Sequence, residues 1–383
     1  MNVGNDRWQV RTQRPIGYDV IKTPDLFDAD NGTLLRFGRH AGGRRFVVVD
    51  GNVARLHGAA IRGWFAHNGI DARVVVFPGG EEHKNIEIYQ DILRELDVFP
   101  IHRRDEPIIA IGGGVLTDVV AFVAATYRRG IPHVKVPTTL MGYIDAALGI
   151  KAGINFNGNK NRLGSFEPPA AVLLDKRFLT TLPARHLRNG VCEIVKLAVV
   201  CDAHLFALLE RDGAHGIATA FQDARGDAIL DAAIGGMLAE LEPNLHEDEL
   251  ARKVDFGHSF SYGLETRHEQ HLLHGEAVLL DVLVSTVLAK RRGLLADADA
   301  ERVFALVERL GLAPDPGLLD ADLMWQSLRD RIEHRNGRQR VPVPSAIGEC
   351  VFLDDIRPRE LDAAIPALHA HLKAHDEPTL ERR

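Results

Sequence analysis

The sequence predicts an α/β protein of two domains, in which a Rossmann-like domain with a parallel sheet precedes a mostly α-helical domain. Short apolar runs alternate with helical patterns in the first half, and long helical patterns take over from about Asp175. A length of 383 residues is enough for two domains. We expect the boundary near residues 170–180, which gives domains of residues 1–175 and 176–383.

Four strands are predicted in the first half, each a short apolar run: Arg45–Asp50, Arg73–Phe77, Ile108–Ile111 and Val134–Val136. A helical pattern from Asn52 to His67 follows the first run, and another, to about Arg128, follows the third. Continuous apolar strands that alternate with helices indicate a parallel sheet covered on both faces.

The second half contains two clear helical patterns and one extended region. The helices are Glu276–Arg292, closed by Gly293, and Asp299–Leu310, with Gly311 as C-cap. Residues 341–344 and 349–353 predict a short hairpin, and the tail from Asp376 to Arg383 is expected to fray.

The composition is that of an ordinary globular protein, with 45% hydrophobic and 26% charged residues. A formal net charge of −7 argues against a nucleic-acid partner. No apolar stretch is long enough to span a membrane, and the start lacks the apolar core of a signal peptide. Three cysteines without disulfide or metal spacing (Cys192, Cys201, Cys350) favour a reducing cytoplasm, and Cys192 is interpreted as a buried core thiol.

The segment Pro107–Asp118 is typical of a buried strand, a turn of three glycines (Gly112 to Gly114) and the start of a helix. Glycines let the backbone approach a diphosphate, and a helix N-terminus favours negative charge. The segment lacks the G-x-G-x-x-G pattern, so a plain Rossmann dehydrogenase is not predicted. A tight turn without any ligand is the alternative.

A second candidate site is the Gly- and Asn-rich stretch from Asp145 to Asn161, which contains Lys151 and Lys160. Such a loop can hold a phosphate through charge-assisted hydrogen bonds. The alternative is a solvated surface loop.

The third signal lies in the helical half. Glu193 and Lys196 are three residues apart among apolar neighbours, which favours a buried carboxylate with a cationic partner over a surface ion pair. His258 and His274 could join Glu193 in a three-ligand metal site with an open position. His268 and His271 have suitable spacing too, and spacing alone does not choose among them.

Together these residues resemble the dehydroquinate synthase-like sugar phosphate cyclases, over about residues 47–353. The shared markers are Gly112-Gly113-Gly114-Val115 with Asp118, Val136-Pro137-Thr138-Thr139-Leu140, Asp145, Lys151, Asn155, Lys160-Asn161, Leu182-Pro183, Glu193 with Lys196, Gly257-His258 and His274-Gly275-Glu276. The resemblance implies bound NAD and a divalent metal, Zn²⁺ or Co²⁺, with a small sugar phosphate as substrate.

The resemblance also implies roles for individual residues. Glu193, His258 and His274 would hold the metal. NAD would contact Asp50, Asn52, Glu81, Lys84, Gly113, Gly114, Val115, Asp118, Thr138, Thr139, Leu140, Phe178 and Thr181. Lys151, Lys196, Asp145, Asn161 and Asp255 would be catalytic, and Lys160, Arg252, Arg129, Asp281 and His334 would bind substrate or its phosphate. Arg129 would reach the partner subunit's phosphate site, which implies a homodimer.

Within this family the chain departs from dehydroquinate synthase, which has Gly-Gly-Lys at Gly149-Ile150-Lys151, His at Tyr262 and Asn at Asp255. The segments Leu241–Leu245, Asn155–Gly158 and His334–Gly337 look instead like those of the C7-cyclitol synthases. That branch acts on sedoheptulose 7-phosphate. We expect 2-epi-5-epi-valiolone as the product, with 2-epi-valiolone and desmethyl-4-deoxygadusol as alternatives.

Other readings stay open at this point. A 3-dehydroquinate synthase would share the whole architecture. A metal-dependent alcohol or glycerol dehydrogenase would lack the phosphate-binding lysines and would release NADH in every turnover. A non-catalytic NAD-binding module would have lost metal ligands or lysines that this chain retains.

Overall fold

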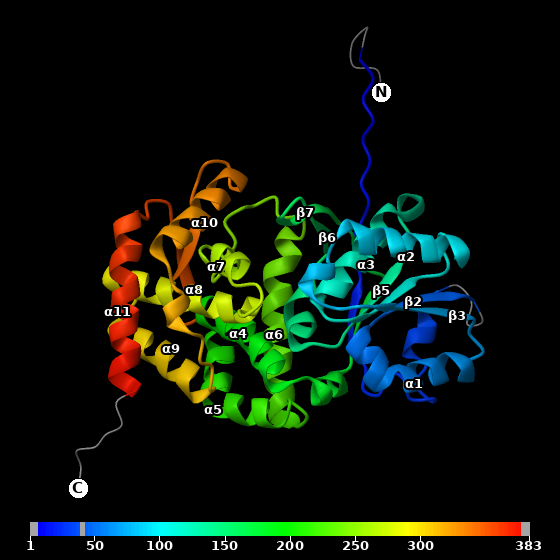
Figure 1. Cartoon of the computed structure of the whole chain (residues 1–383), viewed down its shortest axis with the longest axis horizontal. Helices are drawn as coiled ribbons and strands as arrows, with labels where there is room; N and C mark the ends of the chain where they lie inside the picture. The colour runs from blue at the N-terminus through cyan, green and yellow to red at the C-terminus, as the bar shows by residue number, and fades with distance from the viewer. Residues whose placement is uncertain (1–6, 39–42, 377–383) are drawn as a thin grey trace.

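A parallel sheet forms one side of the protein, as predicted. The computed structural model describes residues 7–38 and 43–376. Six strands lie in the order β1-β8-β5-β4-β2-β3, and all their pairings are parallel. The strands are β1 (Asp19–Lys22), β2 (Arg45–Asp50), β3 (Ala72–Phe77), β4 (Ile108–Gly112), β5 (His133–Pro137) and β8 (Ala171–Leu174). We call residues 19–174 the sheet region; it occupies the blue and cyan end of the molecule (Figure 1).

Helices cover both faces of this sheet because its central strands are apolar on both sides. On one face, α1 (Gly51–His67) packs Ile61, Trp64 and Phe65 against Val47 and Ile109. On the other face, α2 (Ile86–Val98) and α3 (Gly114–Thr126) pack against the alternate residues of β2 and β4. The four strands predicted from apolar runs are therefore confirmed as β2, β3, β4 and β5.

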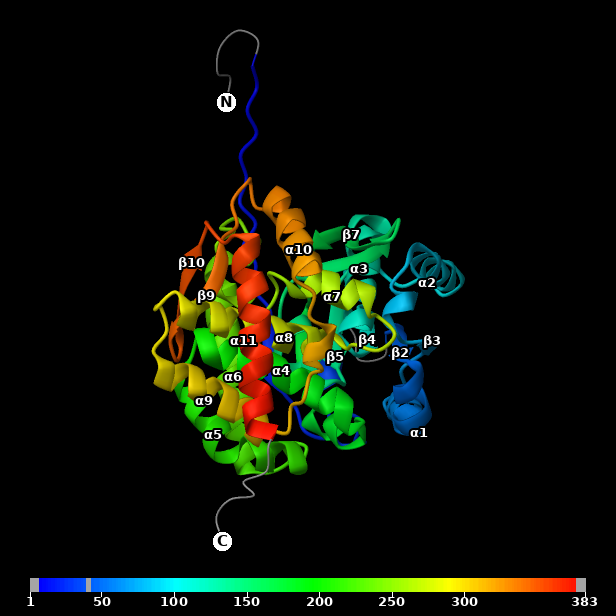
Figure 2. The same cartoon turned by 60° about the vertical axis from the view of Figure 1, so that its left-hand side comes forward.

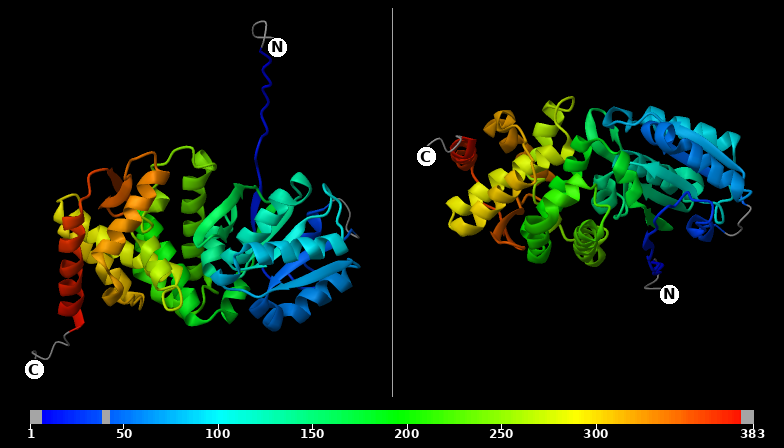
Figure 3. Two further views of the ribbon diagram at one scale, coloured as in Figure 1. Left: turned by 45° about the horizontal axis from the view of Figure 1, so that its top comes forward. Right: turned by 90° about the horizontal axis from the view of Figure 1, so that it is seen from below.

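The second half is mainly helical. Its elements are α4 (Ala184–Val200), α5 (Ala203–Ala218), α6 (Ala224–Leu241), α7 (Ser261–Arg267), α8 (His274–Arg291), α9 (Asp297–Arg309), α10 (Ala321–His334), β9 (Val341–Ala346), β10 (Glu349–Leu353) and α11 (Pro358–Asp376). Helix α8 is buried almost throughout, and α4 packs against it. This helical region, residues 184–376, lies beside the sheet region, with α11 at the far end (Figures 1 and 3). In Figure 2, α11 faces the viewer.

Most predicted helices and the C-terminal hairpin are confirmed, with ends shifted by one or two residues. Helix α8 begins at His274 rather than Glu276, and α9 spans Asp297–Arg309. Strands β9 and β10 pair antiparallel. Helix α3 ends at Thr126, before a 3₁₀ turn in which Arg128 has a left-handed φ of 50°. The tail predicted to fray lies almost wholly outside the described residues.

One prediction about local structure is wrong. The Gly- and Asn-rich stretch is not an irregular loop, because β6 (Lys151–Phe156) and β7 (Asn159–Phe166) pair antiparallel across a turn at Asn157 and Gly158. Both turn residues have a positive φ, of 54° and 75°, which Asn and Gly accept more readily than other residues. We call this element the β6–β7 hairpin. Among the described residues, no helix is long and apolar enough to cross a membrane.

Candidate active site

Three side chains converge at the centre of the helical region, and they are the three predicted metal ligands. Glu193 comes from α4, His258 precedes α7, and His274 is the first residue of α8. Their ligand atoms all lie within 4.8 Å of one another. Glu193 Oε1 is 3.4 Å from His274 Nε2 and 3.8 Å from His258 Nε2. The described residues contain no other such cluster, so His268 and His271 are not brought to the site.

Both histidines are oriented by a partner on the ring nitrogen that faces away from the cluster. His258 Nδ1 lies 3.1 Å from the carbonyl oxygen of Phe256, and His274 Nδ1 lies 3.1 Å from Glu265 Oε2. A carbonyl oxygen can only accept, so His258 Nδ1 donates and leaves the lone pair on Nε2. This is the arrangement that fixes metal-binding imidazoles in known sites.

The carboxylate of Glu193 is fully buried, and no described residue gives either oxygen a hydrogen bond of good geometry. Lys196 Nζ lies 2.5 Å from Oε2 as an ion pair, so the predicted buried pair is confirmed. Burial acts to raise the pKa of Glu193, but Lys196 outweighs it, with help from His274 and His258, and holds that pKa well below its usual range. A buried anion with unused acceptor capacity beside two imidazoles fits a divalent cation such as zinc, with a position left open for substrate.

Asp145 lies next to this cluster, and the charges of Lys196, Glu193 and Lys151 influence its pKa. Burial raises the pKa of Asp145, and Lys196 opposes that shift. The residue sits in a single π-helical turn, Gly142–Ala146, in which the Ala147 amide donates to the Gly142 carbonyl over 3.1 Å. Such turns insert one extra residue into a helix and occur often at functional sites.

A second cluster, which we call the cationic cluster, joins Lys151 to Arg252, Arg331 and Arg335 through two carboxylates. Lys151 Nζ is 2.5 Å from Glu247, and Arg252 pairs with both Glu247 and Asp255. Asp255 also lies 3.3 Å from Arg331 and 2.7 Å from Arg335. Four cations against two anions leave the cluster with excess positive charge. Burial alone would raise the pKa of Asp255, yet Arg331 and Arg252 hold it far below its usual range.

The proposed NAD residues gather at the carboxyl ends of β2, β4 and β5. In the sheet order, the chain runs from β2 outward to β3 and then returns to β4 on the other side of β2. Ligands of open α/β sheets bind at such switch points. Asp50 ends β2 and caps α1 by accepting from the amides of Asn52 and Val53. A Cβ on Gly112 would lie 3.1 Å from the Cβ of Asp50.

The glycines of the turn are needed for space and not for a special φ, since none of the three has a positive value. A Cβ on Gly113 would lie 3.1 Å from Thr139, and one on Gly114 would lie 2.9 Å from the Cβ of Ala146. No side chain caps the start of α3, so its first amides face the switch point without a side-chain acceptor. Thr138 donates its amide to Gly112 there, and Val115 lies in the first turn of α3.

Lys84 and Asp118 form a buried ion pair beside these glycines, at 2.7 Å. Burial acts to lower the pKa of Lys84, but Asp118 and Glu81 outweigh it and leave the pKa raised. Lys84 also donates to Asn161 of the hairpin over 2.6 Å, and Glu81 accepts from Asn155 over 2.8 Å. The hairpin is therefore bonded directly to the proposed cofactor residues.

Of the three remaining proposed cofactor residues, Leu140 and Phe178 are buried and Thr181 is exposed. Leu140 is fully buried against Gly190 of α4, so its side chain belongs to the core. Phe178 is 5% exposed and meets His57 edge to face, while Thr181 hydrogen-bonds His57 over 2.9 Å.

Two predicted substrate contacts are not supported by the geometry. Asp281 is fully buried and accepts from the amides of Phe260 and Ser261 and from the Ser285 hydroxyl, so it supports the start of α7 instead of facing substrate. Lys160 is 13% exposed and pairs with Glu265 at 2.6 Å, which leaves it less available to a phosphate than predicted.

His334 ends α10, and its side chain lies outside the described part of the structure. Arg129 is exposed after α3 and has a left-handed φ of 62°.

Sequence reasoning missed Glu265, Arg331 and Arg335. Glu265 lies on α7, and its partner His274 is nine residues farther along the chain at the start of α8, so no helical spacing connects the two. Arg331 and Arg335 are four residues apart and so share a helix face, but nothing local connects them to Asp255.

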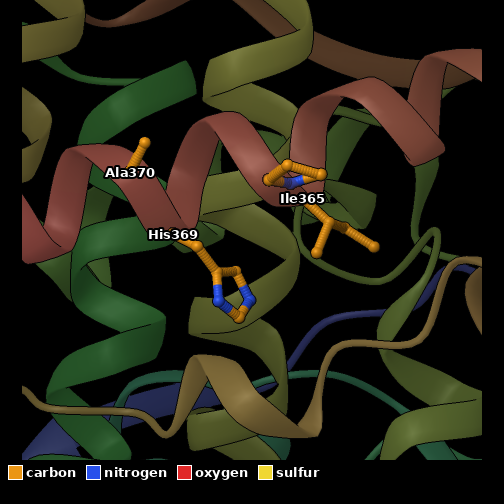
Figure 4. A pocket seen from close by; sticks show the side chains of 4 residues that line it. Ile365, His369 and Ala370 are labelled. Carbon is orange, nitrogen blue, oxygen red and sulfur yellow. The ribbon is translucent and has the colours of Figure 1, made fainter.

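A separate hollow on α11, lined by Ile365, Pro366, His369 and Ala370, shares no residue with the site (Figure 4).

Comparison with protein families identifies the fold. The 3-dehydroquinate synthase N-terminal model matches residues 74–189, and the C-terminal model matches residues 190–332. A 2-epi-5-epi-valiolone synthase from Actinoplanes sp. is 48% identical over 379 residues, which cover 97% of this chain and 95% of that protein. The chain belongs to the dehydroquinate synthase family.

Other members of the dehydroquinate synthase family are similar over nearly their whole length. The demethyl-4-deoxygadusol synthase of Trichormus variabilis is 37% identical over 94% of this chain and 89% of that protein. ValA, a 2-epi-5-epi-valiolone synthase from Streptomyces hygroscopicus solved with NAD⁺ and Zn²⁺ bound, has a TM-score of 0.91 and 41% identity, over 95% of this chain and 100% of that chain. A glycerol dehydrogenase from Schizosaccharomyces pombe, at 16% identity and a TM-score of 0.69, shares the fold.

Proposed function

We propose that this chain is a sugar phosphate cyclase, a carbon–oxygen lyase that converts sedoheptulose 7-phosphate to 2-epi-5-epi-valiolone and phosphate. The cationic cluster carries the proposal: Lys151, Arg252, Arg331 and Arg335 outnumber Glu247 and Asp255 beside the proposed metal ligands. A dianionic phosphate would balance that charge, whereas a simple alcohol would not. The identity of 48% to a 2-epi-5-epi-valiolone synthase supports the same reaction.

The proposed site divides the work among three groups of residues. Bound NAD⁺ would supply reversible hydride acceptance, and a zinc or cobalt ion held by Glu193, His258 and His274 would supply Lewis acidity. Asp50, Lys84, Asp118 and the first amides of α3 would hold the cofactor at the switch point. Lys151 and Arg252 would hold the phosphate, assisted by Asn161 from the hairpin.

Lys196 and Asp145 would handle protons near the metal ligands. Lys196 is 2% exposed, and burial works against its charge, but Glu193 and Asp145 outweigh burial and raise its pKa. The residue would therefore be present as a cation, which can donate a hydrogen bond to a substrate oxygen. The phosphate itself could accept the proton during its elimination, which explains why cations near it matter more than a dedicated carboxylate.

The test is one incubation of purified protein with sedoheptulose 7-phosphate, NAD⁺ and Zn²⁺. We expect stoichiometric phosphate, no accumulation of NADH, and an NMR spectrum of 2-epi-5-epi-valiolone. Steady NADH release would show a dehydrogenase. Turnover of 3-deoxy-arabino-heptulosonate 7-phosphate instead would show a dehydroquinate synthase.

The identity of 37% to a demethyl-4-deoxygadusol synthase makes that product the second candidate. NMR distinguishes it and 2-epi-valiolone from the proposed product in the same incubation. We further propose a homodimer in which Arg129 reaches the partner's phosphate site, in a reducing cytoplasm consistent with the free cysteines Cys192, Cys201 and Cys350.

A further inference from the structure

Glu265 stands between the metal ligand His274 and a lysine from the β6–β7 hairpin. Its Oε2 lies 3.1 Å from His274 Nδ1, and its Oε1 lies 2.6 Å from Lys160 Nζ. The two oxygens of one carboxylate thus connect α8 of the helical region to β7. Glu265 is 15% exposed and Lys160 is 13% exposed, so water competes little with either contact.

The elements on both sides of Glu265 are held in place. On the hairpin side, the Lys160 amide lies 3.3 Å from the hydroxyl of Tyr262, one helical turn before Glu265 on α7. Next to Lys160, Asn161 accepts from Lys84, which pairs with Asp118. On the opposite side, the Gly263 amide donates to Ser327 of α10 over 2.9 Å.

We propose that Glu265 and Lys160 are positioning residues for the metal: Glu265 orients His274, and Lys160 acts only through Glu265. A carboxylate on the far nitrogen fixes the ring of a metal-binding histidine and increases its basicity. Lys160 restrains that carboxylate and assigns its two oxygens to different partners. The orientation of His274 would then depend on Lys160, a residue of the sheet region, through contacts that do not involve α4. This inference rests on the proposed metal site.

The readout is the zinc dissociation constant, measured by competition with a chromogenic chelator, because it does not depend on turnover. We expect Glu265→Gln to weaken zinc binding by about 10- to 100-fold, as for other outer partners of metal ligands. Lys160→Met should weaken it by a smaller factor, about 2- to 10-fold. Lys160→Arg keeps the cation and should restore most of the affinity.

The double variant separates this role from general damage to the fold. If Lys160 acts through Glu265, the double variant Lys160→Met with Glu265→Gln binds zinc as Glu265→Gln does, within about twofold. Fully additive losses would overturn the dependence of Lys160 on Glu265, and unchanged affinity in Glu265→Gln would overturn the proposal as a whole. In Co²⁺-loaded protein, the visible absorption bands should shift in Glu265→Gln.

The matched control is Lys290→Met. Lys290 lies on α8, the same helix as His274, and its substitution removes an ion pair with Glu301 of α9. Lys290 is about 24 Å from His274 along the helix axis, and its loss should leave zinc affinity unchanged. The wild type is measured first. Failure of the wild type to bind zinc would refute the proposed metal site itself, whereas normal wild-type binding with unchanged variants would refute only this inference.

Discussion

Lys151 is the residue of the cationic cluster whose side chain is most open to solvent, at 59% exposed, and its amine pairs only with Glu247 among the described contacts. It can therefore exchange that partner for a phosphate at little cost, because exposed ion pairs are weak. Arg335, by contrast, is buried and also donates to the carbonyls of Gln339 and Arg340. Within one cluster, Arg335 is placed to hold Asp255, and Lys151 is placed to receive a ligand.

We predict that Lys151→Ala raises the KM for sedoheptulose 7-phosphate and lowers kcat/KM by about 10- to 100-fold, the equivalent of a charge-assisted hydrogen bond. Steady-state kinetics of phosphate release measures this. Lys22→Ala is the control, since Lys22 pairs with Asp231 at a similar exposure of 49%. Unchanged kinetics in Lys151→Ala would refute its role.

His133 gives a prediction on pH. The ring is fully buried, neither nitrogen has a hydrogen-bond partner among the described residues, and burial together with the nearby Lys135 lowers its pKa from 6.5 to about 3. Below pH 6.5, His133 becomes protonated in the unfolded chain but stays neutral in the folded chain until the pH approaches 3. Stability from this residue is therefore complete above pH 6.5 and falls as the pH drops toward 3, by about 3 kcal/mol at pH 4.5.

Urea unfolding at pH 7 and pH 4.5, in EDTA so that metal release does not contribute, measures this effect. His133→Leu should lose about 3 kcal/mol less than the wild type between the two pH values. An equal loss in both proteins would show that His133 is not the titrating group.

At the scale of elements, α4 and α8 are in close contact beside the proposed metal ligands. The Gly275 amide donates to Asn189 Oδ1 over 2.7 Å. A Cβ on Gly275 would lie 2.1 Å from the carbonyl oxygen of Asn189, which no real contact allows. Glycine here lets the helix of Glu193 meet the helix of His274.

We predict that Gly275→Ala separates the two helices, destabilises the protein by about 1–3 kcal/mol and weakens zinc binding. Thermal unfolding with and without zinc, together with chelator competition, measures both effects. Gly235→Ala in α6 is the control, because a Cβ there meets nothing within 4 Å. That variant should be as stable as the wild type or up to about 1 kcal/mol more stable.

The strands that the sequence predicts well are those whose signal is local. Apolar β-branched runs identify β2 to β5 within a residue or two. The β6–β7 hairpin was missed because the turn and the start of β7, residues 157–162, are polar, although the Asn157-Gly158 pair was a usable hairpin signal. Strands β1 and β8 were not recognised, because each has only four residues and at most two of them are β-branched.

At the scale of the whole molecule, the site depends on contacts between residues far apart in sequence. Resemblance to a family selected Glu193, His258 and His274, which spacing alone could not separate from His268 and His271. The resemblance could not predict that the Asp281 carboxylate would accept hydrogen bonds from the start of α7. Nor could it predict that Arg335 would pair with Asp255, 80 residues away in the sequence. Such pairings follow from how the helices pack, which no local pattern encodes.

Subunit complementation tests the proposed homodimer. Arg129→Ala and Lys151→Ala should each have at most about a tenth of the wild-type kcat/KM alone, but a mixture refolded or exchanged together should recover about a quarter of it. Half of the dimers would be mixed, and one of their two sites would be intact. No recovery would place Arg129 in its own subunit's site or outside the mechanism.

The π-helical turn at Gly142–Ala146 has a consequence for how this chain can change over time. An extra residue in a helix rotates everything after it by about 100°. Loss of one residue within the turn and before Asp145 would restore regular winding and change the direction in which the Asp145 side chain points. Apart from Asp145, the length of this turn should be more constrained than the identity of its residues. In descendants and designed chimeras alike, insertions and deletions should therefore be tolerated elsewhere in the chain before they are tolerated here.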